Sequence, residues 1–220
     1  AIDAYGAGAG INDPLRISKS TFTGDAEGSC GNSGSGISMI YVDNSYASLD
    51  DLTISDNGYG IFLSQSSGEV LNSDITVNCA AIDTKGFKQT GSIKHTLDIN
   101  DNVLTTTSGA GITAYDQARV SAHRNTISGA EQGSGVAIRS SVVELQSNNI
   151  GPIGGYNGIW IYGTSDVTAI GNTITDVGKE PVVHGEYHYQ DSGWPSVAPT
   201  ESRLYICLLY TSPSPRDATL

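Results

Sequence analysis

The sequence is short of charged and aromatic side chains and contains no long apolar run. Charged residues make up 15% of the 220 residues and aromatic residues 7%, whereas Gly occurs 27 times. Because Gly destabilises helix interiors, this composition favours many short strands joined by tight turns. No apolar run approaches the ~20 residues of a membrane-spanning helix, so we expect no membrane insertion.

Positive charge is also scarce. The chain has 11 Lys and Arg residues against 23 Asp and Glu residues, which gives a formal net charge of −12. An acidic chain repels phosphate backbones, so nucleic acid is not an expected partner. Direct binding of an acidic polysaccharide would need a local basic patch or a bridging cation.

Cysteine is too rare for a disulfide framework. Of the three cysteines, Cys30 and Cys79 could pair in an oxidising compartment, or both could be buried as small apolar residues. The chain starts at Ala1 without Met or a signal peptide, which is typical of a cut end and also of a mature secreted protein. The sequence leaves both questions open.

What the sequence does contain is an internal repeat. Three consecutive stretches align almost without gaps: GITAYDQARVSAHRNTI (111–127), GVAIRSSVVELQSNNI (135–150) and GIWIYGTSDVTAIGNTI (158–174). Each has Gly, two apolar-x-apolar pairs, and then Asn, one residue and an aliphatic residue. At ~3.3 Å per strand residue, three short strands and three turns fill one coil of a three-sided solenoid. Looser copies cover 14–24, 36–54, 60–77 and 97–104, and 80–96 carries an insertion.

Asn recurs at a constant place in this repeat. Asn102, Asn125, Asn148 and Asn172 are separated by 23, 23 and 24 residues. If the coils stack ~4.8 Å apart, the four amides lie above one another and each can donate to the next. A polar side chain that is costly to bury alone is then satisfied by repetition. Asn also tolerates the left-handed conformation that a sharp corner demands.

The repeat resembles those of the pectin-lyase-like superfamily, whose right-handed parallel β-helices contain an internal asparagine ladder. The resemblance implies an all-β, three-sided, right-handed parallel β-helix over 1–178, with about six to seven coils of 21–24 residues and one insertion. We expect 179–203 to be an irregular last coil or a cap. Residues 204–220, LYICLLYTSPSPRDATL, look like a translated sequencing adaptor of the kind found in assembled environmental sequences, so we interpret them as a non-native tail and the chain as a fragment.

The outward positions of the first strand in each coil form columns. One column is predicted to hold Ser38, Phe62, Thr113, Ala137 and Trp160, and the next Ile40, Ser64, Tyr115, Arg139 and Tyr162. The group Tyr115, Arg139, Trp160 and Tyr162 suits a saccharide, because rings cover sugar C–H groups and a guanidinium binds a uronate carboxylate. The resemblance implies a substrate lying across this sheet. Cross-strand pairing for stability alone would explain the same residues.

A second candidate site lies in HGEYH. In an extended strand, His184, Glu186 and His188 would share one face and could bind Zn²⁺ or a similar ion. A solvated polar segment is the alternative interpretation. The sequence indicates no other cofactor, although Ca²⁺ or another divalent cation stays open.

Catalytic motifs of the superfamily are incomplete. NTD, GHG, RIK and DPHE are missing, as is the Arg motif of pectate lyases, and paired DD occurs only at Asp50–Asp51. We therefore expect a monomeric, secreted or cell-surface module that binds a polysaccharide or cell-surface glycan, or serves as a structural or adhesive stalk. The alternative is a polysaccharide lyase, glycoside hydrolase or uronan epimerase in which Arg139 neutralises a uronate and Tyr115 or Tyr162 acts as the base.

Overall fold

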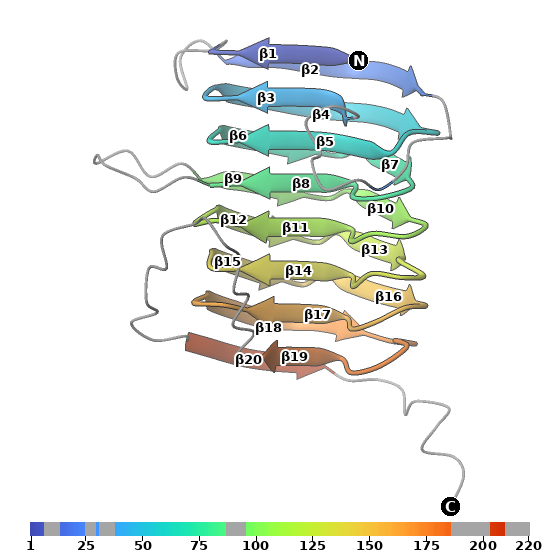
Figure 1. The fold of residues 1–220 in the computed structure, drawn as a ribbon, viewed down its shortest axis with the longest axis vertical. Helices are drawn as coiled ribbons and strands as arrows, with labels where there is room; N and C mark the ends of the chain where they lie inside the picture. The colour runs from blue at the N-terminus through green and yellow to red at the C-terminus, as the bar shows by residue number, and fades with distance from the viewer. Residues whose placement is uncertain (7–13, 25–29, 31–37, 87–95, 186–202, 210–220) are drawn as a thin grey trace, which may run out of the picture.

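The computed structural model describes residues 1–6, 14–24, 30, 38–86, 96–185 and 203–209. These residues form strands, turns and bends, and no helix occurs among them. Accordingly, this part of the chain contains no helix long and apolar enough to cross a membrane. The strands stack as successive coils along one axis, from β1 at one end to β19 and β20 at the other (Figure 1). The described residues therefore form a three-sided parallel β-helix.

The first side is a sheet of eight strands, one from each coil, and all its pairings are parallel. Its strands are β1 (Ile2–Tyr5), β3 (Ser38–Asp43), β5 (Tyr59–Ser64), β8 (Ile82–Lys85), β11 (Ile112–Tyr115), β14 (Val136–Arg139), β17 (Ile159–Tyr162) and β19 (Val182–Gly185). The apolar-x-apolar pairs face inward, as the alternation predicts. Ile61, Ile82 and Ile112 stack on neighbouring strands and each is 0% exposed.

The other two sides form one continuous sheet, because long strands bend around the corner between them. The long strands are β2 (Leu15–Thr23), β4 (Tyr46–Ser55), β18 (Asp166–Ile174) and β20 (Arg203–Leu209). The second side adds β6 (Ser67–Leu71), β9 (Leu97–Asn100), β12 (Arg119–His123) and β15 (Val142–Gln146), and the third adds β7 (Asp74–Val77), β10 (Val103–Thr106), β13 (Thr126–Gly129) and β16 (Asn149–Ile153). A continuous aliphatic core fills the space between the three sides.

The four predicted asparagines form a ladder at the corner between the second and third sides. They are at most 2% exposed. In each step, the backbone N–H and the side-chain Nδ2 of one Asn donate to Oδ1 of the Asn in the next coil, at 2.8 to 3.0 Å. Each Nδ2 also donates to a backbone carbonyl of the preceding coil, at 2.8 to 2.9 Å. The ladder is confirmed, and the two inner amides, those of Asn125 and Asn148, are saturated by their neighbours.

One detail of the corner differs from the expectation. None of the four ladder asparagines has a positive φ; the residue before each one does, with φ of 61° at Asp101, 56° at Arg124, 56° at Ser147 and 65° at Gly171. The preceding residue turns the chain, and the carboxamide can then point into the interior. The expectation that Asn itself takes the left-handed conformation was wrong.

The ladder continues where the sequence has no Asn. The Ser73 N–H donates to Asn102 Oδ1 at 2.9 Å, and Ser73 Oγ accepts the Leu52 N–H at 3.1 Å. A hydroxyl thus takes over the role of the carboxamide in the earlier coil. Ser73 lies two residues before the aliphatic Ile75, as the asparagines do, so its position in the repeat was a usable signal.

The β-helix extends past the clear repeat at its C-terminal end. β19 pairs with β17, and β20 pairs with β18 along most of its length. Residues 203–209 therefore form a strand that the sequence pattern did not predict. The division into 1–178, 179–203 and a non-native 204–220 stays a prediction, and 186–202 and 210–220 lie outside the described residues.

We predict that Asn148→Ala destabilises the protein strongly. The change removes the acceptor for the backbone N–H of Asn125 and for one of its two side-chain N–H bonds, and leaves these two bonds unsatisfied in the interior, while the bond from Nδ2 to the Ile99 carbonyl remains. An unsatisfied buried donor costs about 1–3 kcal/mol, so we expect the free energy of unfolding in urea to fall by about 2–4 kcal/mol.

Asn149→Ala is the matched control for this variant, because Asn149 is the next residue and is exposed. Its effect should stay within about 0.5 kcal/mol. Equal effects of the two substitutions would contradict the energetic role of the ladder.

Candidate functional site on the first sheet

The structure brings the predicted saccharide-site residues together on the outer surface of the first sheet. Tyr115 lies opposite Arg139, and Arg139 lies opposite Tyr162. Trp160 lies opposite Ala137 in the neighbouring column. The predicted columns are therefore correct over β11, β14 and β17, and the four candidate residues form one patch spanning three rungs, or about 10 Å.

The columns were assigned wrongly in β3. Tyr41 and Asp43 occupy the outward positions opposite Phe62 and Ser64. Ile40, which was expected outside, is 0% exposed in the core. The stretch SMIYV has too many consecutive apolar residues for alternation to set its phase, and a shift of one residue exchanges the two faces.

Strand β8 contributes two outward residues that the sequence reasoning missed. Asp83 lies opposite Thr113, and Lys85 lies opposite Tyr115. Residues 80–96 were interpreted as an insertion, because the second inward position of β8 is the polar Thr84, which hides the apolar-x-apolar pair. The sequence still offered one signal for this strand. The apolar run AAI (80–82) ends in Ile82, which occupies the stacked aliphatic position of the repeat.

Arg139 is held in place by two neighbours. Its Nη2 donates to Asp116 Oδ1 at 2.8 Å, and its guanidinium lies 5.4 Å from the centroid of the Tyr115 ring. Lys85 Nζ lies 3.9 Å from the other oxygen of Asp116. Two cations thus share one carboxylate. All three charged side chains stay about one-third exposed, so a ligand can reach them.

Trp160 and Tyr162 form an aromatic surface beside this ion pair. Their ring centroids are 4.5 Å apart with an interplanar angle of 27°, and both side chains are half-buried. Such a stack presents apolar area and a polar edge together. It is suited to the C–H face of a sugar ring, with Arg139 available for a neighbouring polar group.

Asp83 is a buried carboxyl on the first sheet with a clearly raised pKa. Its side chain is buried, with 6% exposure, although it occupies an outward column. Thr113 Oγ1 and the Tyr115 hydroxyl donate to it. Burial raises the pKa of Asp83 to about 6, and the hydrogen bonds and the charge of Lys85 only partly offset this. A carboxyl in this state can exchange a proton near neutral pH.

The two tyrosines of the patch are donors rather than bases. Burial, followed by the nearby charges of Asp83 and Asp116, raises the pKa of Tyr115 above its ordinary value. Burial also raises the pKa of Tyr162, against the opposing effect of Arg139. Because both hydroxyls hold their protons more tightly than usual, this geometry does not support the expected assignment of either one as a catalytic base.

Aromatic rings also occupy outward positions in the earlier coils. Tyr5 and Tyr41 have ring centroids 5.3 Å apart, and Tyr41 and Phe62 are also 5.3 Å apart. Tyr41 and Phe62 share one column with Asp83, whereas Tyr5 lies opposite Asp43 in the neighbouring column. The sequence reasoning placed Phe62 correctly but missed the two tyrosines.

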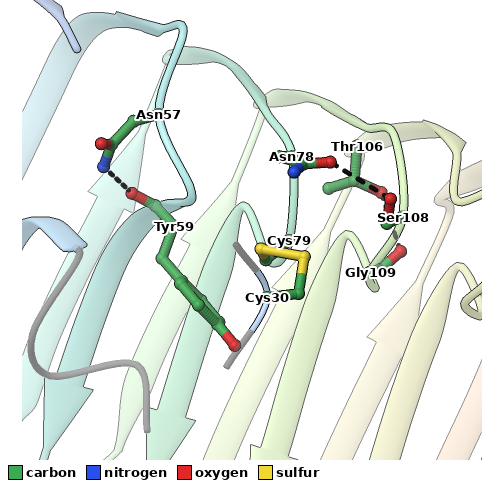
Figure 2. Close-up of a disulfide and its surroundings, with 8 residues drawn as sticks. All are labelled: Cys30, Asn57, Tyr59, Asn78, Cys79, Thr106, Ser108 and Gly109. Carbon is green, nitrogen blue, oxygen red and sulfur yellow. Dashed lines mark hydrogen bonds between the residues drawn. A yellow bond between two sulfur atoms is a disulfide. The ribbon is translucent and has the colours of Figure 1, made fainter. Parts of the chain in front are cut away.

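Cys30 and Cys79 form a disulfide across 49 residues of sequence, so the question that the sequence left open is answered by the structure. Figure 2 shows the bridge at the corner that precedes β8. Side chains brace the same corner in neighbouring coils: Asn57 Nδ2 donates to the Tyr59 carbonyl at 2.6 Å, and Ser108 Oγ donates to Asn78 Oδ1 at 3.1 Å (Figure 2). The disulfide therefore attaches Cys30 to Cys79, which lies four residues before Asp83 in the sequence.

The predicted metal site is only partly described. His184 lies in β19, opposite the inward-facing Ile161, and is exposed at the last rung of the sheet. Glu186 and His188 lie outside the described residues. In the described part of the chain, no group of three or more His, Cys, Asp or Glu side chains is arranged to hold a metal ion.

Comparison with known proteins supports the fold. A family model described as a right handed beta helix region matches residues 1–150, which is more than half of the chain. This match agrees with the parallel stacking and with the right-handedness that the family resemblance implied. No curated protein and no solved structure matches the chain significantly.

We predict that Asp83→Asn removes a pH-dependent destabilisation. Because the pKa of Asp83 is higher in the folded than in the unfolded chain, its contribution to stability is present below about pH 4 and is lost as the pH rises through about 6. A difference of about two pKa units corresponds to at most about 3 kcal/mol. The free energy of unfolding of wild type should therefore fall relative to that of Asp83→Asn across this interval.

Asp74→Asn provides the control, since Asp74 is an exposed carboxylate on the third side. Its pH profile should follow that of wild type. Parallel profiles for wild type and Asp83→Asn would contradict the ionisation assigned to Asp83.

Proposed function

We propose that this chain, which belongs to the right-handed β-helix family, binds a saccharide chain across the outer surface of the first sheet. The observation that carries the proposal is the stack of Trp160 on Tyr162 beside Arg139. These three large, half-buried groups on neighbouring rungs provide both apolar area and hydrogen-bond donors. This combination is what sugar rings require.

The charges of the patch favour an acidic saccharide. Lys85 and Arg139 share Asp116, so the two cations are only partly neutralised when Asp83 holds its proton. Arg139 offers further N–H donors, which can bind a carboxylate or sulfate group of a ligand. An acidic chain with net charge −12 then binds an acidic ligand through this local patch.

We further propose that the protein acts outside the cytoplasm, on the cell surface or in the surrounding medium. The disulfide between Cys30 and Cys79 supports this, because disulfides persist in oxidising compartments. The stacked β-helix also supplies the stiff scaffold that a structural or adhesive protein needs, so the glycan-binding and structural roles are compatible.

We predict that Trp160→Ala weakens saccharide binding at least about tenfold, because one aromatic ring in a sugar site contributes on the order of 1–2 kcal/mol. Binding should be screened on an array of acidic and neutral polysaccharides and then measured by calorimetry. Tyr156→Ala is the matched control, since Tyr156 is an exposed aromatic residue that packs against Lys179 outside the patch. Equal losses in both variants, or no retained polysaccharide, would overturn the proposal.

A second candidate function is cleavage of the bound saccharide, and the observation that favours it is Asp83. A buried carboxyl with a pKa near 6 can act as a general acid, and its hydrogen bond to Tyr115 places it at the patch. Arg139 would neutralise an acidic substituent of the substrate. Proton transfer from Asp83 to the glycosidic oxygen would assist departure of the leaving group, and addition of water at the anomeric carbon would complete the hydrolysis.

Incubation with pectate, alginate and chondroitin tests this second function. We expect unsaturated or reducing ends to accumulate, and Asp83→Asn to lower the rate about 10²–10⁴-fold, as is usual for loss of a general acid. Asp74→Asn should retain the wild-type rate. Absence of product from wild type at ordinary protein loading would dismiss cleavage and leave binding as the function.

A further inference from the structure

We infer that protonation of Asp83 controls the affinity of the first sheet for anionic saccharides, so that the patch holds carboxylate- or sulfate-bearing chains in mildly acidic solution and releases them at neutral pH. This inference rests on the binding function proposed above. It adds the regulation of that site and narrows its ligands to anions.

Asp83 lies beside the charged cluster of Lys85, Asp116 and Arg139. The titratable groups that interact with its charge are Lys85 from its own strand, Tyr59 from β5, Tyr115 from β11 and Tyr162 from β17. Asp116 follows β11, and Arg139 lies on β14, two strands from β8. Asp83 itself is 6% exposed. A change of charge at such a site is poorly screened by solvent and acts on the whole cluster.

The net charge of the cluster depends on the protonation state of Asp83. With Asp83 ionised, two carboxylates, Asp83 and Asp116, oppose two cations, Lys85 and Arg139. With Asp83 protonated, the same cluster has an excess of one positive charge. An anionic group approaching Arg139 is therefore attracted by a net positive cluster in one state and meets a neutral cluster in the other.

The hydrogen bonding of Asp83 also changes with its protonation state. The carboxylate accepts from both Thr113 and Tyr115. A protonated carboxyl has an O–H of its own to donate and binds a hydroxyl donor less strongly. The Tyr115 hydroxyl, whose ring lies against the Arg139 guanidinium, can then donate to the same anionic group of a ligand that Arg139 binds.

The pH interval follows from burial. Burial raises the pKa of Asp83 to about 6, so the proton is lost between mildly acidic and neutral solution. Linkage makes the effect reciprocal: an anion that prefers the protonated form must raise the pKa of Asp83 when it binds. A neutral saccharide has no such preference.

The test measures binding of oligogalacturonates and of uncharged galacto-oligosaccharides by calorimetry at about pH 5 and about pH 7.5, at constant ionic strength. For wild type, we expect the affinity for oligogalacturonates to fall at least about tenfold over this interval and the affinity for the uncharged sugars to stay constant. Asp83→Asn, which mimics the protonated state, should bind oligogalacturonates at both pH values as tightly as wild type does at the lower one. Asp74→Asn should retain the wild-type fall.

The outcomes separate this inference from the proposed function. Saccharide binding that is equally tight at both pH values, or a fall that persists in Asp83→Asn, overturns the inference and leaves the function standing. Absence of binding at either pH overturns the function itself. If Asp83→Asn does not fold, an NMR titration of the Asp83 carboxyl in wild type decides the question, because saturating oligogalacturonate must raise its midpoint and an unchanged midpoint overturns the inference.

Discussion

The hydrogen bonds between stacked carboxamides are the interaction on which the rest of the structure depends. The two inner asparagines, Asn125 and Asn148, each use the side-chain oxygen twice and the side-chain nitrogen twice, all within 2.8 to 3.0 Å. No single coil can satisfy these groups, because every partner lies in the coil before or after. The fold is therefore collective: a coil is stable only as a member of the stack.

The same ladder determines what the outer surface displays. Side chains alternate along a strand, so a slip of one residue between coils would bury the outward columns and expose the core. By holding coils in register at one corner, the carboxamides also hold Tyr115, Arg139 and Tyr162 in line on the first sheet. The fold and the candidate site therefore depend on the same periodic constraint, although the ladder and the site lie on different sides of the β-helix.

Buried polar groups have two distinct meanings in this protein. Asn125 and Asn148 are repeated, neutral and saturated, and their role is structural. Asp83 occurs once, is ionisable, and stays buried in a column that faces outward. Burial raises its pKa because the hydrogen bonds around it do not fully replace water. The contrast is why the proposed chemistry centres on Asp83.

The sequence by itself determined the coil length, the apolar alternation, the asparagine ladder and the columns of β11, β14 and β17, because all of these are periodic and a period can be read along one chain. Only the tertiary structure decided the phase of β3, the place of β8 and the pairing of Cys30 with Cys79. These depend on contacts between coils at positions where the repeat is interrupted. Asp83 is an example. Its burial and its hydrogen-bond partners depend on neighbouring strands and produce no periodic pattern in the sequence, so only the structure identified it.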